Sequence, residues 1–324
     1  MAKTETAIPK AIGRRYNEIP DNSRQVWANP TFSLLQFSQA EVARMWNDGR
    51  INDDYVLIIK FLRLAKFATA DQISRALNKN VSDEYLSKMV KEMFLNSFIL
   101  SEFGFEDDLK SPTVLHFYTL DFGGQYLNSI IGEDMTNWRY TDLMVGTSLI
   151  KKNLIQTELL ISFNNSKTLA LRDYKQFKEL RIGNKVVKTD FQASFKNRKN
   201  TSTIIDFVGF VVNAGTEDVS FKESVEGLQT IFNATNAWKR YYPLGTKPHF
   251  LIVIEDSTQP AQIIRVAEIL GQLSDFSTRD IFIVGANEIT DKGLGDTGVY
   301  TYSVSEVDDE RKVNVGKIKT ELFK

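Results

Sequence analysis

The chain has 324 residues, 42% of them hydrophobic and 25% charged, which is typical of a folded globular protein of about two domains. A net charge of -1 and a pI near 6.2 exclude a strongly basic nucleic-acid coat, and zero cysteines exclude disulfides, zinc ribbons, iron–sulfur ligation and thiol nucleophiles. The two histidines, His116 and His249, are too few and too far apart in sequence for the histidine-clustered metal centre of relaxase nickases.

The first predicted segment, residues 1–50, is an N-terminal arm followed by a short helix. Three prolines and little periodicity predict an extended arm over about 1–31. Ser38-Gln39-Ala40-Glu41 is a capping pattern, and it predicts a short helix that ends at Asn47-Asp48-Gly49.

Residues 51–132 follow the order of a winged helix-turn-helix. A helix with regularly spaced apolar residues is followed by Thr69-Ala70-Asp71-Gln72, a capping box that starts a second helix. Ser82 caps a third helix, whose apolar residues lie along one face. Two β-like runs and a loop complete the predicted domain: 98–105, 113–120 and, between them, the predicted wing 106–112.

The third helix is the candidate recognition helix, because two short helices at a tight turn suit insertion of the second into a DNA major groove. Its candidate DNA-binding residues are Ser87, Lys88 and Lys91. The exposed positions are nevertheless charge-balanced, and the wing tip Glu106-Asp107-Asp108 would be repelled by phosphates. A second interpretation therefore stays open, in which this domain docks or dimerises with proteins.

The sequence after residue 132 predicts a polar connector, 133–142, and an α/β domain, 143–324. A helix over 143–163 starts this domain, and further strands and helices follow: strands 168–171, 186–194 and 204–212, helix 221–238, strand 250–255, helix 261–273, and strands 281–284 and 299–303. This order predicts an α/β sandwich with helices on both faces of a mixed sheet.

The same order is used by nucleases of the restriction-endonuclease-like fold, which hold Mg²⁺ with carboxylates on neighbouring strands. Asp190 lies on the first such strand, but Val211 and Asn213 stand where the next strand requires a carboxylate and a lysine. Asp206 and Glu217 could substitute only in a different strand register. We expect Asp190 to cap a strand end and the domain to have no catalytic residues, metal or cofactor. A cryptic Mg²⁺-dependent nuclease is the third interpretation.

Residues 172–199 hold nine basic and three acidic residues, a local surplus of positive charge in a nearly neutral chain. Such a stretch can neutralise DNA phosphates and make binding depend on salt. The candidates for phosphate contact are Arg172, Lys175, Lys178, Lys196, Arg198 and Lys199. The alternative is a solvated rim whose lysines keep an edge strand from pairing.

Both halves together resemble the replication-relaxation family of plasmid and mobile-element proteins. The resemblance rests on the capped helix-turn-helix 69–96, the wing-closing segment Phe117–Gly124, the helix through Ser148 and Asn153, Asp190, and the Gly215-Thr216-Glu217 tail of the family's acidic strand. Val211 and Asn213 depart from the acidic positions of that strand. The resemblance implies a DNA-associated role in the replication, relaxation or transfer of a mobile element, without implying chemistry.

We therefore expect an α+β protein, in which an N-terminal winged helix-turn-helix precedes an α/β sandwich resembling a degenerate restriction-endonuclease-like fold. The expected function is that of a non-enzymatic accessory factor that binds double-stranded DNA in the cytoplasm, with other replication or transfer proteins as further partners. No apolar run is long enough to span a membrane, so no membrane partner is expected. We also expect a homodimer. Its candidate surfaces are the arm with Trp27 and Phe32, the helix through Val42, Met45 and Trp46, and the helix 143–163.

Overall fold

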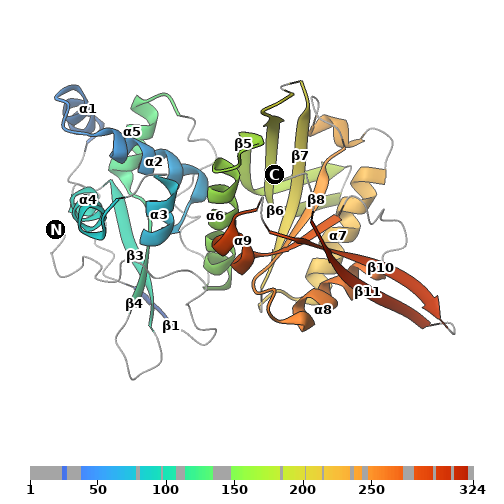
Figure 1. Cartoon of the computed structure of the whole chain (residues 1–324). Coiled ribbons are helices and arrows are strands. Elements are labelled where there is room, and N and C mark those ends of the chain that lie inside the picture. Colours follow the sequence, from blue (N-terminus) through green and yellow to red (C-terminus); the bar gives the residue numbers. More distant parts are fainter. Residues whose placement is uncertain are drawn as a thin grey trace. The chain divides into compact units, whose positions relative to one another are not determined.

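The computed structural model describes residues 24–27, 38–77, 81–95, 98–106, 114–133, 147–182, 185–200, 202–213, 215–233, 237–242, 247–272, 281–294, 297–307 and 310–319 (Figure 1). It is a mixed α+β structure with two compact units, 1–157 and 158–324, which divide inside helix α6 (Thr147–Asn164). Most of the predicted wing 106–112, the predicted connector beyond Glu133 and most of the predicted N-terminal arm lie outside the described residues.

Three helices of the first unit begin after capping residues that the sequence predicts, Ser38, Thr69 and Ser82. Ser38 accepts a hydrogen bond from the Glu41 N–H. Thr69 forms a complete capping box, because its hydroxyl accepts from the Gln72 N–H and the Gln72 side chain accepts from the Thr69 N–H. The helices are α1 (Gln39–Asn47), α2 (Asp53–Ala65), α3 (Ala70–Ala76), α4 (Asp83–Leu95) and α5 (Phe122–Ile130).

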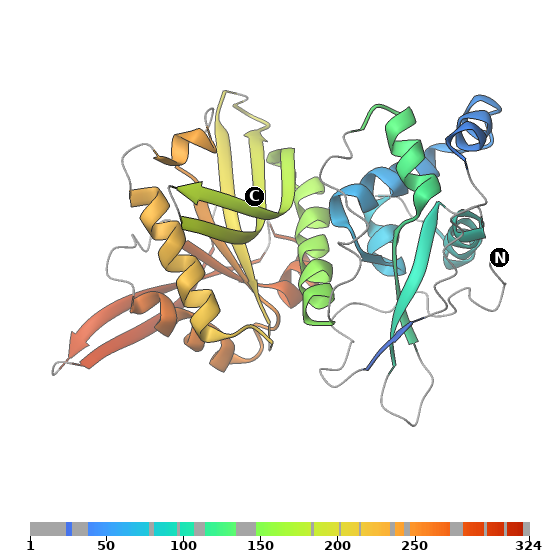
Figure 2. The same ribbon diagram turned by 180° about the vertical axis from the view of Figure 1, so that it is seen from behind.

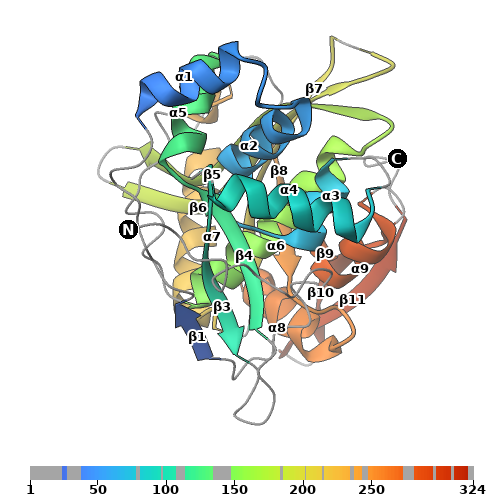
Figure 3. The same cartoon turned by 90° about the vertical axis from the view of Figure 1, so that its left-hand side faces the viewer.

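A four-stranded antiparallel sheet completes this unit, in the order β1-β3-β4-β2. Its strands are β1 (Arg24–Trp27), β2 (Ala68–Thr69), β3 (Ile99–Glu106) and β4 (Val114–Leu120). β3 and β4 lie side by side as an antiparallel pair (Figure 3). The two-residue β2, between α2 and α3, pairs with β4. β1, which lies in the predicted arm, pairs with β3.

Apolar side chains from α2, α3, α4 and the strands form the core of the unit. Ile59, Leu62, Ile73 and Met93 are each fully buried, and complete burial of such side chains contributes about 1.5–3 kcal/mol apiece. Helix α5 approaches β3 so closely that a Cβ at Gly124 would lie 2.4 Å from the Phe98 carbonyl oxygen. Glycine is therefore required at this point of the packing.

The second unit contains a seven-stranded mixed sheet in the order β11-β10-β9-β8-β7-β6-β5. The strands are β5 (Leu169–Ile182), β6 (Lys185–Asn197), β7 (Ile204–Val212), β8 (His249–Ile254), β9 (Ile281–Gly285), β10 (Val299–Val307) and β11 (Glu310–Ile318). β7, β8 and β9 are parallel and the other pairs are antiparallel. The mixed sheet agrees with the prediction. The sequence analysis did not predict β11, and it predicted only the start of β5.

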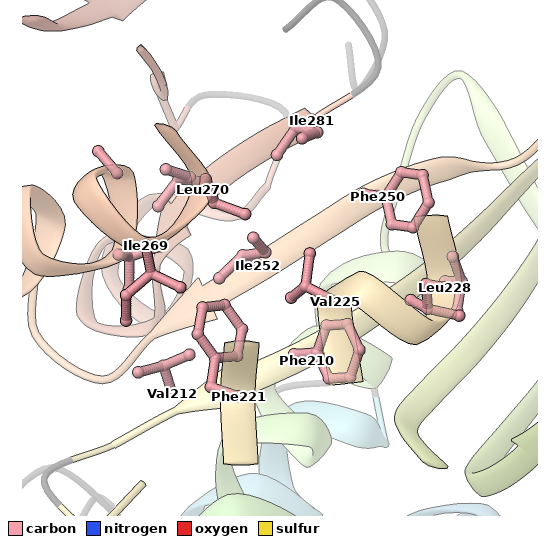
Figure 4. Close-up of a cluster of buried hydrophobic side chains, with 14 of the residues drawn as sticks. Phe210, Val212, Phe221, Val225, Leu228, Phe250, Ile252, Ile269, Leu270 and Ile281 are labelled. Atoms are coloured by element: carbon pink, nitrogen blue, oxygen red, sulfur yellow. The ribbon is translucent and has the colours of Figure 1, made fainter. Parts of the chain in front are cut away.

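Helices pack on both faces of this sheet, as the sequence predicts. On one face, Phe210 and Ile252 meet side chains of α7 (Asp218–Asn233) and α8 (Pro260–Gly271), including Phe221 and Leu270 (Figure 4). On the other face, Phe163 of α6 packs edge-on against Phe195, with ring centroids 4.7 Å apart. Strand alternation places these two groups on opposite faces.

The predicted helix 221–238 is wrong in its extent. α7 ends at Asn233, and a separate 3₁₀ turn, η4 (Ala237–Arg240), follows. The far end of the β5–β6 hairpin lies over α7 (Figure 2), where a Cβ at Gly227 would come within 2.4 Å of a Val187 methyl group. Glycine in a helix interior costs about 1 kcal/mol, and here it permits this crossing. The last helix is α9 (Ala286–Lys292). In the described part of the chain, no helix has both the length and the apolar character needed to cross a bilayer.

Candidate functional site

Two tyrosine–carboxylate hydrogen bonds hold α4 against α2. Tyr85 on α4 donates to Asp54 at 2.7 Å, and Tyr55 on α2 donates to Glu92 on α4 at 2.6 Å. Burial raises the pKa of Tyr55, and the bond to Glu92 and its charge raise it further. The bond to Asp54 is the main cause that raises the pKa of Tyr85. The two bonds run in opposite directions between the helices and fix the rotation of α4 about its axis.

This rotation buries one side of α4 and exposes the candidate DNA-binding residues. Leu86, Met89, Val90 and Met93 are each 3% exposed or less. Ser87, Lys88 and Lys91 share another face, because residues three and four apart are neighbours on a helix. Lys88 is exposed, and Ser87 and Lys91 are partly exposed. The Ser87 hydroxyl donates to the Asp83 carbonyl oxygen at 2.7 Å and keeps its lone pairs as acceptors.

The start of α4 is acidic and partly apolar. Asp83 and Glu84 are exposed in the first turn, where negative charge stabilises the helix dipole. Tyr85 is 40% exposed, and Leu57, one helical turn after Asp54 on α2, is 48% exposed. This end of α4 therefore combines negative charge with exposed apolar surface.

The structure separates the basic residues of 172–199 by their surroundings. Lys175 forms an ion pair with Asp173 at 2.9 Å. Arg172 lies near the carboxyl group of Asp206, and its charge acts on the pKa of that group. Burial raises this pKa, and the Ser194 hydrogen bond and the charge of Arg172 counter the rise only in part. The side chain of Lys178 lies outside the described residues. Three candidates gather at the end of β6, all exposed: Lys196, Arg198 and Lys199.

Hydrogen bonds order the backbone of the turn between β6 and β7. The Asn197 side chain accepts from the N–H groups of Lys199 and Asn200, at 2.8 and 3.2 Å. The Arg198 N–H donates to the Thr168 carbonyl oxygen at 2.8 Å. Lys167, also exposed, is therefore brought beside Arg198. The sequence prediction missed Lys167, because the pairing of Leu169 with Asn197 depends on a register that no local pattern reveals.

The nuclease-like positions have structural roles in this fold. The pairing of β6 with β7 ends at Phe191 opposite Gly209, and just beyond it Asp190 accepts the Val211 N–H at 2.7 Å. Asp190 therefore bonds a backbone N–H of the neighbouring strand, but it lies inside β6 and not at the strand end that the sequence analysis expected. Val211 is fully buried.

The other polar residues near these strands lie apart from Asp190. Asp206 pairs with Ser194, four residues from Asp190 along β6, a separation of roughly 13 Å. Asn213 forms a turn with Thr216, whose hydroxyl donates to the Asn213 side chain at 2.9 Å, and Glu217 is exposed. Among the residues that the structure describes, no three His, Asp or Glu side chains are grouped to hold a metal ion.

A polar network around Glu288 joins the last strands of the sheet, and the sequence gives no signal of it. Glu288 accepts hydrogen bonds from Ser257 at 2.7 Å, Tyr300 at 2.8 Å and Lys317 at 2.6 Å. Burial by itself would raise the pKa of Glu288, but these bonds outweigh it and leave the pKa below its usual value. The network ties β10 and β11 to the loop after β8 and to α9. Its members come from separate elements, so no spacing rule predicts it.

No protein-family model matches the chain, and no curated protein matches it in sequence. The functional proposal consequently rests on two surfaces: the exposed face of α4 and the basic end of β6.

Proposed function

We propose that the protein is a non-enzymatic accessory factor that binds double-stranded DNA in the cytoplasm, with a role in the replication, relaxation or transfer of a mobile element. The observation that carries the proposal is the face of α4 with Ser87, Lys88 and Lys91, whose exposure is fixed by the two tyrosine–carboxylate bonds between α4 and α2. The resemblance to the replication-relaxation family supplies the biological setting.

The order of elements supports a winged helix-turn-helix as the DNA-binding domain. Helix α2, strand β2, helices α3 and α4 and the hairpin β3–β4 follow one another, and β2 pairs with β4. In this arrangement α3 crosses the DNA backbone and α4 lies in the major groove as the recognition helix. The hairpin β3–β4 leads to the wing.

In such a complex the lysines neutralise phosphates or donate to guanine, and Ser87 contacts a phosphate or a base edge. Asp83 and Glu84, at the helix start, are acceptors that suit the amino group of cytosine. Their repulsion of the phosphate backbone makes the single domain a weak binder, so the proposal includes a homodimer that reads two half-sites.

The second unit is proposed to be a degenerate relative of the restriction-endonuclease-like fold. Asp190 accepts a backbone N–H, and buried Val211 and turn-forming Asn213 occupy the positions of the missing catalytic residues. In this proposal the unit contributes binding surface and no catalysis.

The test is a DNA mobility-shift titration with Lys88→Ala/Lys91→Ala, at two salt concentrations, on random-sequence and plasmid-derived duplexes. Loss of these contacts should weaken binding by about 1–3 kcal/mol. The matched control is Arg44→Ala/Arg50→Ala, which removes two exposed cations from α1 and the loop that follows it. Equal affinity of the Lys88/Lys91 variant and the unchanged protein would reject α4 as the reading helix.

A second candidate is a protein-docking module, and the exposed pair Leu57 and Tyr85 favours it. Aromatic and aliphatic side chains at a surface are common anchors of protein interfaces. If Leu57→Ser abolishes self-association while DNA affinity is absent in every variant, the docking function is the correct one.

A further inference from the structure

We infer that the turn between β6 and β7 is a second contact site for nucleic acid, which holds the phosphate backbone without reading sequence. The site consists of Lys167, Lys196, Arg198 and Lys199 and is called the basic turn below. The inference rests on the proposed function for the identity of its partner, but it concerns a different unit of the chain from α4.

The basic turn concentrates positive charge in a small region of backbone. Lys196, Arg198 and Lys199 lie within four consecutive residues, and the bond from the Arg198 N–H to Thr168 brings Lys167 alongside. The flanking stretches 165–172 and 195–205 contain no Asp or Glu. All four side chains are exposed, and none forms an ion pair with any residue that the structure describes.

The carboxylates of Asp173 and Asp206, which lie near the basic turn in sequence, are already engaged. Asp173 pairs with Lys175, and Asp206 is buried, 3% exposed, with Ser194 and Arg172 acting on it. Lys175 is paired with Asp173 and Arg172 lies near Asp206, so we leave these two cations out of the site. The four cations of the basic turn keep their charge for an external anion.

Hydrogen bonds also join the described residues of the turn, 197–200 and 202. Asn197 accepts two backbone N–H groups, and Arg198 donates both its N–H and its Nε, the latter to the Leu169 carbonyl oxygen at 3.3 Å. A further bond joins the Asn200 side chain to the Ser202 hydroxyl at 2.6 Å. An ordered turn presents its cations at lower entropic cost than a flexible tail.

The chemistry of the turn fits phosphate better than protein. Its side chains beside the cations are Asn, Ser and Thr, which contact phosphates in complexes, and it exposes no large apolar residue that could anchor a protein interface. The oxygens of Asn197 and Asn200 are occupied by bonds within the turn, so these amides are poorly placed to read adenine. The partner is therefore a phosphate backbone, contacted independently of base sequence.

The experiment measures the affinity of the full chain for a random-sequence duplex at five salt concentrations. Lys196→Ala/Lys199→Ala should reduce the slope of log affinity against log salt by about one unit for each lysine that contacts a phosphate. At about 0.1 M salt the affinity should fall roughly tenfold or more. The loss should be the same on duplexes of different sequence.

The matched control is Lys312→Ala/Lys319→Ala. It removes the same charge from exposed positions on and just after β11, the strand at the opposite end of the same sheet from β5. This control should keep the slope of the unchanged protein. An equal fall in both double variants would mean that only total charge matters, and no fall in Lys196→Ala/Lys199→Ala would mean that the turn does not touch DNA; either overturns the inference.

The outcomes separate this inference from the proposed function. Weaker binding in Lys196→Ala/Lys199→Ala with full binding in Lys88→Ala/Lys91→Ala would keep the basic turn and reject α4. The reverse would keep α4 and reject the turn. An unchanged protein that binds no duplex at any salt concentration would reject both.

Discussion

The hydroxyl of Tyr85 lies 2.7 Å from the carboxylate of Asp54, so the exposed start of α4 is tied to the first turn of α2. Asp54 is only 7% exposed, and a buried carboxylate that loses a donor is costly. The bond therefore fixes the position of the start of α4 against α2. In the proposed complex this is the end of the recognition helix that contacts the bases.

Tyr85→Phe should loosen α4 without unfolding the unit. The lost donor costs about 1–3 kcal/mol, which should accelerate amide hydrogen exchange in α4 by roughly tenfold if those amides exchange by local opening. The control is Tyr126→Phe on α5, a partly exposed tyrosine of the same unit. Equal exchange in α4 for both variants would show that the Tyr85 bond does not hold the helix.

Glu288→Gln should change how the free energy of unfolding depends on pH in the acidic range. The pKa of Glu288 is lowered in the folded state, so its stabilising contribution is present above the ordinary glutamate pKa and is lost as pH falls through the folded value. The variant should be less stable at pH 7, because Lys317 loses its carboxylate partner at 2.6 Å, and its stability should vary less between about pH 5 and 2. Urea unfolding across this range measures the effect. Glu268→Gln, at an exposed position on α8, is the control, and identical curves for the two variants would contradict the expectation.

Asp206→Asn should stabilise the second unit at neutral pH. Burial raises the pKa of Asp206, so the protonated form suits the folded state, and this advantage is lost as pH rises through the folded value. The uncharged amide should therefore raise the free energy of unfolding at pH 7 by about 1 kcal/mol and have little effect near pH 3. Thermal unfolding at both values checks this. A variant that is less stable at pH 7 would mean that the attraction to Arg172 outweighs burial.

Incubation of the protein with supercoiled and linear DNA, with Mg²⁺ or Mn²⁺, should give no nick. The reason is that Asp190 accepts the Val211 N–H and its neighbours at the expected catalytic positions are Val211 and Asn213. Cleavage that disappears in Asp190→Ala would contradict this prediction and indicate a nuclease.

Light scattering at micromolar concentration should give close to twice the 36.9 kDa chain mass. Of the dimer surfaces expected from the sequence, the apolar residues of α6 are mostly buried, including Ile150, Leu154 and Leu159, whereas Trp46 on α1 is 38% exposed. Trp46→Ser should therefore favour the monomer. The mass of Leu57→Ser, measured in the same way, tests the other exposed apolar side chain. A monomer that binds a single half-site tightly would contradict the dimer.

Local patterns were sufficient for the parts of the fold that local physics determines. The capping residues Ser38 and Thr69 mark helix starts because their side chains bond N–H groups a few residues away. The buried strands β7 and β8 are recognisable as apolar runs. By contrast, β11 alternates apolar residues with lysine, asparagine and glycine at the edge of the sheet, and its sequence lacks the signal of a buried strand.

The candidate sites depend more on distant pairing. The exposed face of α4 could be predicted, because the spacing of apolar residues within this one helix shows which side is buried. The addition of Lys167 to the basic turn could not, since it follows from the register of β5 with β6, and neither could the partners of Glu288. Contacts between residues far apart in sequence depend on topology, which single-chain patterns leave open.

Strand β1 comes early in the chain, yet its partner β3 is synthesised much later. During translation β1 has no strand to pair with until residues 103–106 have emerged, so this edge of the first sheet closes only after the segments of α1 to α4 have been synthesised. A chain shortened to begin after residue 37 would leave one side of β3 with unpaired backbone groups. Strands of this kind recruit a strand from another molecule, so the shortened protein should aggregate where the full chain does not.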